Sequence, residues 1–142
     1  MILVDANLLI YAYNSSAEQH EKARAWVESV FTGHVPVRFA WSTIHAFLRL
    51  TTHAALFHRP FSIGDATDIV EGWLALPLTG LLEPGPAYWS IFRALLHDAQ
   101  VRGPLVMDAH LAALAIEHGA VLHTSDRDFR RFDGLQLVDP LR

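Results

Sequence analysis

The chain has 142 residues, 51% hydrophobic and 18% charged, which suffices for one large core, so we expect a single domain over residues 1–142. The formal net charge of −4 argues against binding of a polyanion by bulk electrostatics, because that mode needs a broad excess of Lys and Arg, but it leaves local contacts open. The absence of cysteine excludes disulfides, thiolate zinc sites and cysteine nucleophiles.

The first residues predict a strand followed by two helices. Met1–Val4 is apolar and too short for a helix, which favours a buried parallel strand. Ala6–Tyr13 predicts the first helix. Ser15 followed by Glu18 is a capping-box pattern, and it predicts a second helix that runs to about Phe31.

The middle of the chain predicts another strand and two more helices. Val37–Trp41 is typical of a strand, and Ser42 suits the N-cap of a helix that ends before the Arg59–Pro60 step. A further helix is expected to start after Ser62 and to stop before Pro77.

The remaining elements continue the alternation of strands and helices. Leu78–Glu83 predicts a third strand, and Pro86 suits the first turn of a helix that runs to about Val101. Val106–His118 predicts the best-defined helix, with Gly119 as its left-handed C-cap.

Two short apolar runs predict the last strands, Ala120–His123 and an edge strand at Leu135–Val138. The alternation as a whole indicates an α/β fold, a three-layer α/β/α sandwich with a central, mainly parallel sheet.

Four aspartates are placed where such a fold would bring them together. Asp5 and Asp126 each close a predicted strand, Asp108 opens the alanine-rich helix, and Asp128 follows two residues after Asp126. Because the carboxyl ends of parallel strands form one rim, we expect these acids to converge. Converging carboxylates repel unless a cation lies between them. The pattern therefore indicates a hard divalent cation and metal-assisted phosphoryl chemistry, although each acid alone also suits a cap or a turn.

Arginines dominate the small set of cations. Arg127, Arg130 and Arg131 lie beside two of the acids, at Asp126 and Asp128. Arginine recognises phosphate in a bidentate manner, so these side chains are candidates to hold phosphate next to a metal. A solvated charged loop is the alternative interpretation.

Other chemistries lack their sequence patterns. The nine histidines include no HExxH, and His110 and His118 lie eight residues apart, which does not predict a zinc site. The chain contains no P-loop, GxGxxG or GxSxG motif. A phosphatase with a strand-end aspartyl nucleophile would want a second acid where Asn7 stands. No apolar run has the length of a membrane span, and MILVD carries an acid where a signal peptide is basic, so we expect a cytoplasmic chain without membrane contact.

Three stretches of the chain carry a family resemblance: MILVDANLLIYAYN followed by HEKARAW, then VMDAHLAALAIEHGAVLHTSDRDFRRFDGL, and the terminal DPL. They resemble the opening and the close of PIN-domain proteins, and more closely the VapC toxins of bacterial or archaeal type II toxin-antitoxin pairs. The resemblance implies a metal-dependent endoribonuclease, a homodimer, and a small VapB-like antitoxin that blocks the acidic site.

The same resemblance implies roles for individual residues. The ligands of Mg²⁺ or Mn²⁺ would be Asp5, Asp108 and Asp126. The supporting residues would be Asp128 as a further acid and the polar side chains of Asn7 and Thr124. The cation would polarise a phosphodiester of RNA and lower the pKa of a water that attacks phosphorus. Arg49 or Arg127 would stabilise charge on the phosphate.

One position departs from the family pattern. The family has a Glu a few residues before an Arg on its third helix, and the matching stretch here is AFLR, from Ala46 to Arg49. His45 is adjacent, but one helical step rotates a side chain by about 100°. Either the site works with fewer carboxylates, or another acid, Asp128 or Glu83, replaces the missing one.

Two alternative functions remain open at this point. Without the Glu, the chain would be a PIN-like module that binds RNA or an antitoxin but cuts poorly. A metal-dependent phosphatase of small molecules is the other alternative.

Overall fold

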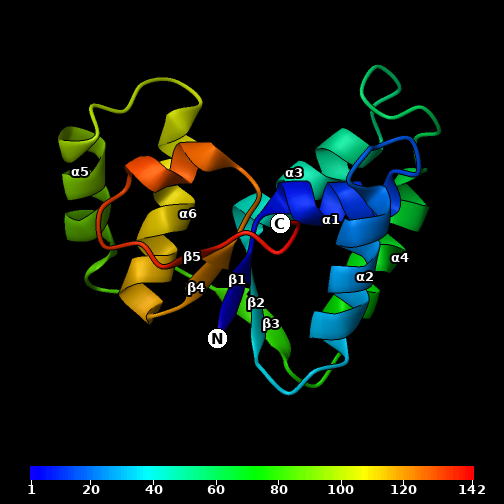
Figure 1. Cartoon of the computed structure of the whole chain (residues 1–142), viewed down its shortest axis with the longest axis horizontal. Helices are drawn as coiled ribbons and strands as arrows, with labels where there is room; N and C mark the ends of the chain where they lie inside the picture. Colours follow the sequence, from blue (N-terminus) through cyan, green and yellow to red (C-terminus); the bar gives the residue numbers. More distant parts are fainter.

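A five-stranded parallel sheet runs through the middle of the molecule, in the order β3–β2–β1–β4–β5 (Figure 1). The computed structural model describes all of residues 1–142. The strands are β1 (Ile2–Val4), β2 (Val37–Ala40), β3 (Thr79–Leu82), β4 (Val121–His123) and β5 (Leu137–Val138). The central strand β1 pairs through Ile2 with Val37 of β2 and with Val121 of β4. Because every pairing is parallel, all five carboxyl ends lie along one edge of the sheet.

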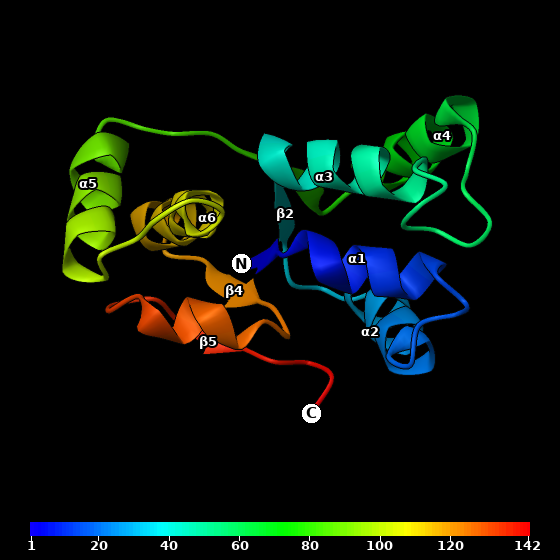
Figure 2. The ribbon, with the colours of Figure 1, turned by 90° about the horizontal axis from the view of Figure 1, so that it is seen from above.

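Helices cover both faces of this sheet, as Figure 2 shows from above. They are α1 (Ala6–Tyr13), α2 (His20–Phe31), α3 (Trp41–Thr51), α4 (Ile63–Leu74), α5 (Tyr88–Asp98), α6 (Leu105–His118) and the 3₁₀ helix η1 (Arg127–Arg131). Helices α5 and α6 lie on one side, and α1 to α4 lie on the other. The predicted three-layer α/β/α architecture with a parallel sheet is therefore confirmed.

The core consists of two apolar clusters that the sheet separates. Neighbouring strand residues point to opposite faces, so Leu3 packs against α5, α6 and η1, whereas Val4 packs against α1 to α4. Four fully buried alanines let α6 approach the sheet closely: Ala109, Ala112, Ala113 and Ala115. Close packing of α6 is what brings its first turn, with Asp108, to the carboxyl edge of the sheet.

Two predicted helix starts are wrong. Helix α2 begins at His20, and the predicted capping box at Ser15 does not form, because Asn14 Oδ1 accepts the Ser16 amide instead (3.1 Å). Helix α3 begins at Trp41, directly after β2, so neither the strand end at Trp41 nor the N-cap at Ser42 is correct.

Two predicted helix ends are also wrong. Helix α3 stops at Thr51 rather than near Arg59, because the loop folds back and the Phe61 amide donates to the Thr51 carbonyl (2.9 Å). Helix α5 runs from Tyr88 to Asp98, with Pro86 in the preceding turn, so it is shorter than predicted at both ends. Gln100 adopts a φ of 50°, and this left-handed residue terminates α5 before Val101.

The other boundaries agree with the predictions to within two residues. Ser62 caps α4 by accepting the Asp65 amide, and Gly119 takes the left-handed C-cap of α6 with a φ of 66°. Strand β5 forms the predicted edge at Leu137–Val138. None of the helices combines the length and the apolarity that crossing a membrane requires.

Candidate metal centre

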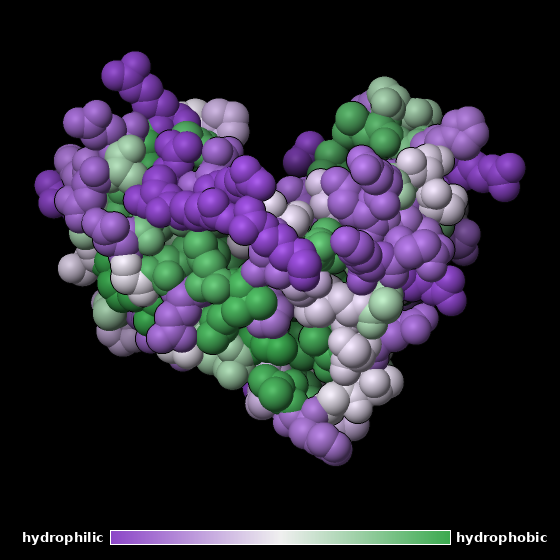
Figure 3. Space-filling model, viewed as in Figure 1, coloured by the Kyte–Doolittle hydropathy of each residue, from purple (hydrophilic) through white to green (hydrophobic).

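A cleft of about 390 Å³ opens at the carboxyl edge of the sheet. Figure 3 shows the molecule notched on the side to which the strands' carboxyl ends point, between the lobe of α5, α6 and η1 and the lobe of α1 to α4. The polar residues of its lining are Asp5, Asn7, Ser42, Thr43, His45, Arg49, Asp108 and Asp126. Because these residues come from four separate segments of the chain, the parallel topology is what assembles the cleft.

Asp5 is the most buried acid of the cleft. It follows β1 directly, the residue is 9% exposed, and Thr124 Oγ1 donates a hydrogen bond to its Oδ2 at 2.7 Å. Burial raises the pKa of Asp5 above its ordinary value, repulsion from Asp126 adds to this, and the Thr124 hydrogen bond opposes it. Strand β1 and the end of β4 therefore hold this carboxylate in one orientation.

The end of β4 builds a second acid beside the first. The Asp126 amide donates to Thr124 Oγ1 (3.0 Å), and Asp126 Oδ1 accepts the Asp128 amide (2.9 Å), which caps η1. Thr124 thus donates to Asp5 and accepts from Asp126 through a single hydroxyl. The capping bond occupies one Asp126 oxygen and leaves the other free to bind a ligand.

Asp108 faces these acids from the first turn of α6. Burial raises its pKa to about 6, and repulsion from Asp126, Asp5 and Asp128 contributes in the same direction, while Arg131 opposes it. A half-buried carboxyl that is repelled by three others is the electrostatic condition that a bound cation relieves.

The donor set fits a hard divalent cation. Single carboxylate oxygens of Asp108, Asp126 and Asp128 lie within 4.8 Å of one another, and Asp5 lines the same cleft as the first two. Carboxylate oxygens are the ligands that Mg²⁺ and Mn²⁺ prefer. The structure thus brings together the four aspartates that the sequence singled out. Asp128 is exposed and forms an ion pair with Arg131 (3.5 Å), so it lies at the margin of the group.

The opposite wall of the cleft is formed by α3 and carries no acid. Ser42, His45, Ala46 and Arg49 all face the cleft from this helix. Glu83, one of the two predicted replacements for the missing Glu, is exposed outside the cleft and accepts from Trp41 Nε1 (3.4 Å). Of the two predicted replacements, Asp128 is the one that lies close to Asp108 and Asp126.

The remaining predicted residues divide between two places. Asn7 and Arg49 line the cleft, whereas Arg127 lines a neighbouring cavity beyond Asp126. The sequence interpretation missed Ser42 as a residue of the cleft, because it assigned that side chain to a helix cap. The signal was present, since Ser42 follows a strand almost as directly as Asp5 does.

Comparison with known proteins agrees with this geometry. The model of the PIN domain family matches residues 2–135. Ribonuclease VapC37 of Mycobacterium tuberculosis is 40% identical over 140 residues, which cover 99% of this chain and 97% of the relative. Ribonuclease VapC33 of the same species is 38% identical over 142 residues, covering 100% and 99%.

Solved structures share the fold at low sequence identity. The structure of VapBC2 from Rickettsia felis bound to a promoter DNA fragment has a TM-score of 0.69 at 15% identity, and the match covers 97% of this chain and 98% of that one. The structure of Mycobacterium tuberculosis VapC20, a toxin that cleaves the sarcin-ricin loop, has a TM-score of 0.64 at 16% identity, covering 96% and 99%. The chain belongs to the PIN-domain family, among the VapC ribonucleases.

Proposed function

We propose that the chain is a Mg²⁺-dependent endoribonuclease and the toxin of a VapBC-type toxin-antitoxin pair. The observation that carries this proposal is the group of mutually repelling carboxylates at the carboxyl edge of the sheet. Its relatives are named ribonucleases, which supports RNA as the substrate.

Asp5, Asp108 and Asp126 would hold the cation, and Mn²⁺ would fit the same oxygen ligands. When bound, the cation supplies polarisation of a phosphodiester and activation of a water for hydrolysis. Thr124 fixes the orientation of Asp5 and positions the backbone of Asp126, so its hydroxyl holds two of the three ligands in place.

Residues of the α3 wall would position the RNA rather than the metal. Arg49 faces the acids across the cleft, where its guanidinium can hold a phosphate oxygen and stabilise charge that develops on it. Asn7 lies in the same lining and offers an amide to the substrate or to a ligand.

A VapB-like antitoxin and a second copy of the chain are the proposed protein partners, and the cytoplasm is the proposed compartment. Several structural neighbours are complexes of a VapC with its VapB, for example VapBC-1 from nontypeable Haemophilus influenzae, which has a TM-score of 0.69. The antitoxin would block the acidic cleft in the complex.

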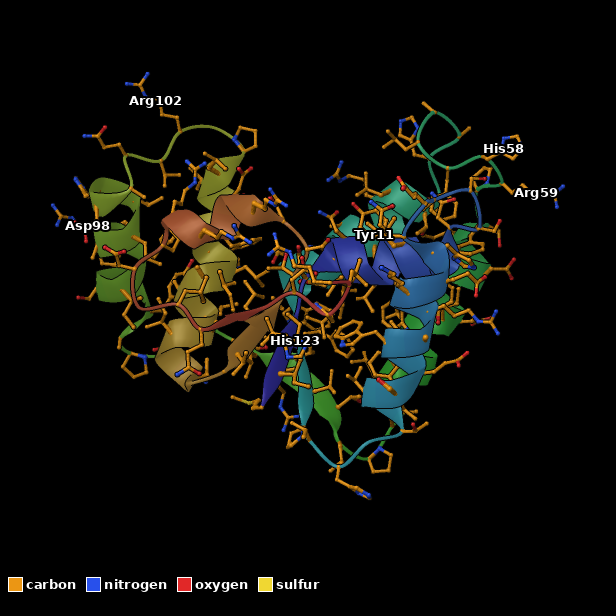
Figure 4. The ribbon with its side chains drawn as sticks, in the orientation of Figure 1. Tyr11, His58, Arg59, Asp98, Arg102 and His123 are labelled. Atoms are coloured by element: carbon orange, nitrogen blue, oxygen red, sulfur yellow. The ribbon has the colours of Figure 1, made fainter.

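The test is cleavage of RNA with Mg²⁺ by the wild type and by Asp5→Asn, Asp108→Asn and Asp126→Asn. Each variant should lose at least about a hundredfold in rate, because it removes a charge from the site where the reaction is stabilised. Asp98→Asn is the matched control, since Asp98 lies on the outer face of α5 and points away from the cleft (Figure 4). Cleavage by all three site variants at the rate of the control would contradict the proposal.

A binding module that cuts poorly is the second candidate function. The acid-free α3 wall, with Ala46 at the position of the family's Glu, is the observation that favours it. In that case the wild type itself would bind RNA but cleave it little faster than the three site variants do.

A further inference from the structure

The 3₁₀ helix η1 sorts its side chains onto three faces. Residues three apart in a 3₁₀ helix superpose, because one turn takes three residues. Phe129 is 1% exposed and packs beside Phe132, with ring centroids 6.2 Å apart, so this face is anchored in the core. Asp128 and Arg131 occupy the second face and form an ion pair. The third face is left to two arginines three residues apart, Arg127 and Arg130.

This third face borders a polar cavity of about 260 Å³. The cavity lies between η1, the end of β4 and the carboxyl-terminal segment, and its lining contains one apolar residue, Leu137. Figure 3 shows strongly hydrophilic side chains over this part of the molecule, beside the notch. Thr124 and Asp126 also line this cavity, so the arginines share a wall with the acidic cleft.

The two arginines carry charge that the fold does not neutralise. Arg142 lines the same cavity but forms an ion pair with Asp139 at 3.6 Å. By contrast, the exposed side chains of Arg127 and Arg130 make no ion pair and no hydrogen bond within the chain. Two unpaired guanidinium groups thus lie in one cavity of a chain whose net charge is −4. A nearby anion would satisfy both, because each guanidinium can donate two parallel hydrogen bonds to phosphate.

We propose that Arg127 and Arg130 form a subsite for a backbone phosphate of RNA, adjoining the phosphate that is cleaved. This inference rests on the proposed function, because it takes the acidic cleft as the place of cleavage. Asp126 borders both cavities, so a strand with one phosphate at the acids passes directly to the arginines. The subsite would hold the strand by its backbone, and it would therefore contribute affinity without selecting a base.

The test measures binding separately from cleavage. The probe is a short fluorescent oligoribonucleotide whose ribose hydroxyls are methylated, and its affinity is followed by anisotropy over a range of salt concentrations. The double variant Arg127→Ala/Arg130→Ala should bind about tenfold more weakly, and its slope of log affinity against log salt should be smaller by about 0.7, the value for one lost phosphate contact on a single strand.

A matched double variant, Arg59→Ala/Arg102→Ala, removes the same charge elsewhere. Figure 4 shows these two side chains pointing outward at opposite ends of the molecule. It should bind within about twofold of the wild type, since its arginines contact no strand in the cleft. Substitution of Arg127 and Arg130 by Lys should restore the salt slope but only part of the affinity, because Lys keeps the charge and loses the bidentate geometry. Circular dichroism checks that all variants are folded.

Three results would overturn the subsite. The first is equal binding of the probe by the Arg127/Arg130 variant and the control. The second is that the Arg127/Arg130 variant loses affinity for inorganic phosphate while it binds the RNA probe as the control does, which would indicate a site for a free anion. The third is a loss of affinity for oligoglutamate with RNA binding intact, which would make an acidic protein segment the occupant. None of them depends on cleavage, so a failure of the proposed nuclease activity is seen separately, in the Asp variants.

Discussion

The two walls of the cleft differ in charge and in how their residues are held. The wall formed by β1, β4 and α6 contributes Asp5, Asp108 and Asp126, and hydrogen bonds of Thr124 tie two of these together. The α3 wall contributes Arg49 and no acid. Two of the acids therefore follow strand ends and the third lies in the first turn of α6, whereas the cationic side chain comes from the helix that faces them.

This difference indicates that the acidic wall is suited to a cation and the α3 wall to a phosphate. On the acidic wall, burial and repulsion by the neighbouring carboxylates raise the pKa of Asp108 to about 6, so a bound cation would stabilise its charged form. On the α3 wall, Ala46 lines the cleft where the family resemblance predicts a Glu, and a phosphate rather than a metal suits the positive charge of Arg49 nearby. The next experiments test this division of roles.

The largest effect is expected from Thr124→Val, which removes the hydroxyl that bonds Asp5 and the Asp126 amide on the acidic wall. Val has nearly the same shape but cannot bond Asp5 or the Asp126 amide, so Mg²⁺ affinity should fall about 10–100-fold. Isothermal titration of the metal measures this change. Thr51→Val is the control, because Thr51 is also buried but its hydroxyl donates only to the Phe47 carbonyl of its own helix. Equal metal affinity in both variants would mean that the acids need no such support.

A smaller effect is expected from Ala46→Glu, which gives the α3 wall the missing acid. An added carboxylate in the cleft should tighten Mg²⁺ binding about tenfold, because affinity rises with the number of charged ligands. Ala46→Gln is the control of similar size without the charge. If cleavage of RNA also rises strongly, the native site is impaired. Unchanged cleavage with tighter metal binding would show that the native acids suffice.

The smallest effect is expected on the stability of the metal-free protein. The folded pKa of Asp108 is raised from 3.8 to about 6, so its contribution to stability is full below 3.8 and is lost as the pH rises through about 6. The wild type should therefore lose a few degrees of melting temperature relative to Asp108→Asn between pH 4 and pH 7. Thermal melts at several pH values measure the difference. Mg²⁺ should reverse it at pH 7 in the wild type, since a bound cation favours the charged carboxylate. A pH-independent difference would indicate that neither burial nor the neighbouring acids raise the pKa of Asp108.

Most of the fold was predictable because its signals are local. The apolar run at Ile2–Val4, the alanine-rich α6 and the Gly119 cap each depend on residues within a few positions. The errors arose where a longer-range contact or an unusual conformation decided the boundary. Helix α3 ends at Thr51, whose carbonyl accepts the amide of Phe61 ten residues later in the chain. Gln100 adopts a left-handed conformation that its residue type does not predict.

The candidate site was predictable to a similar degree. Acids at the strand ends were visible in the sequence, since parallel strands must place their carboxyl ends together. Two features depend on how α3 packs: Arg49 lies opposite these acids, and Glu83 lies outside the cleft, where it accepts from Trp41 of α3. No pattern in the sequence encodes that packing.

The sequence by itself determined the class of fold and identified the four aspartates as candidate site residues. The reason is that strands, helices and the acids that follow strands are recognisable from short stretches of chain. Only the tertiary structure decided how the acids are held, through a bond between residues 119 positions apart, Asp5 and Thr124. It also decided that Arg127 and Arg130 share a cavity beside the acidic cleft. The physical reason is that hydrogen bonds and cavities depend on the distances between elements, which the packing of the core sets.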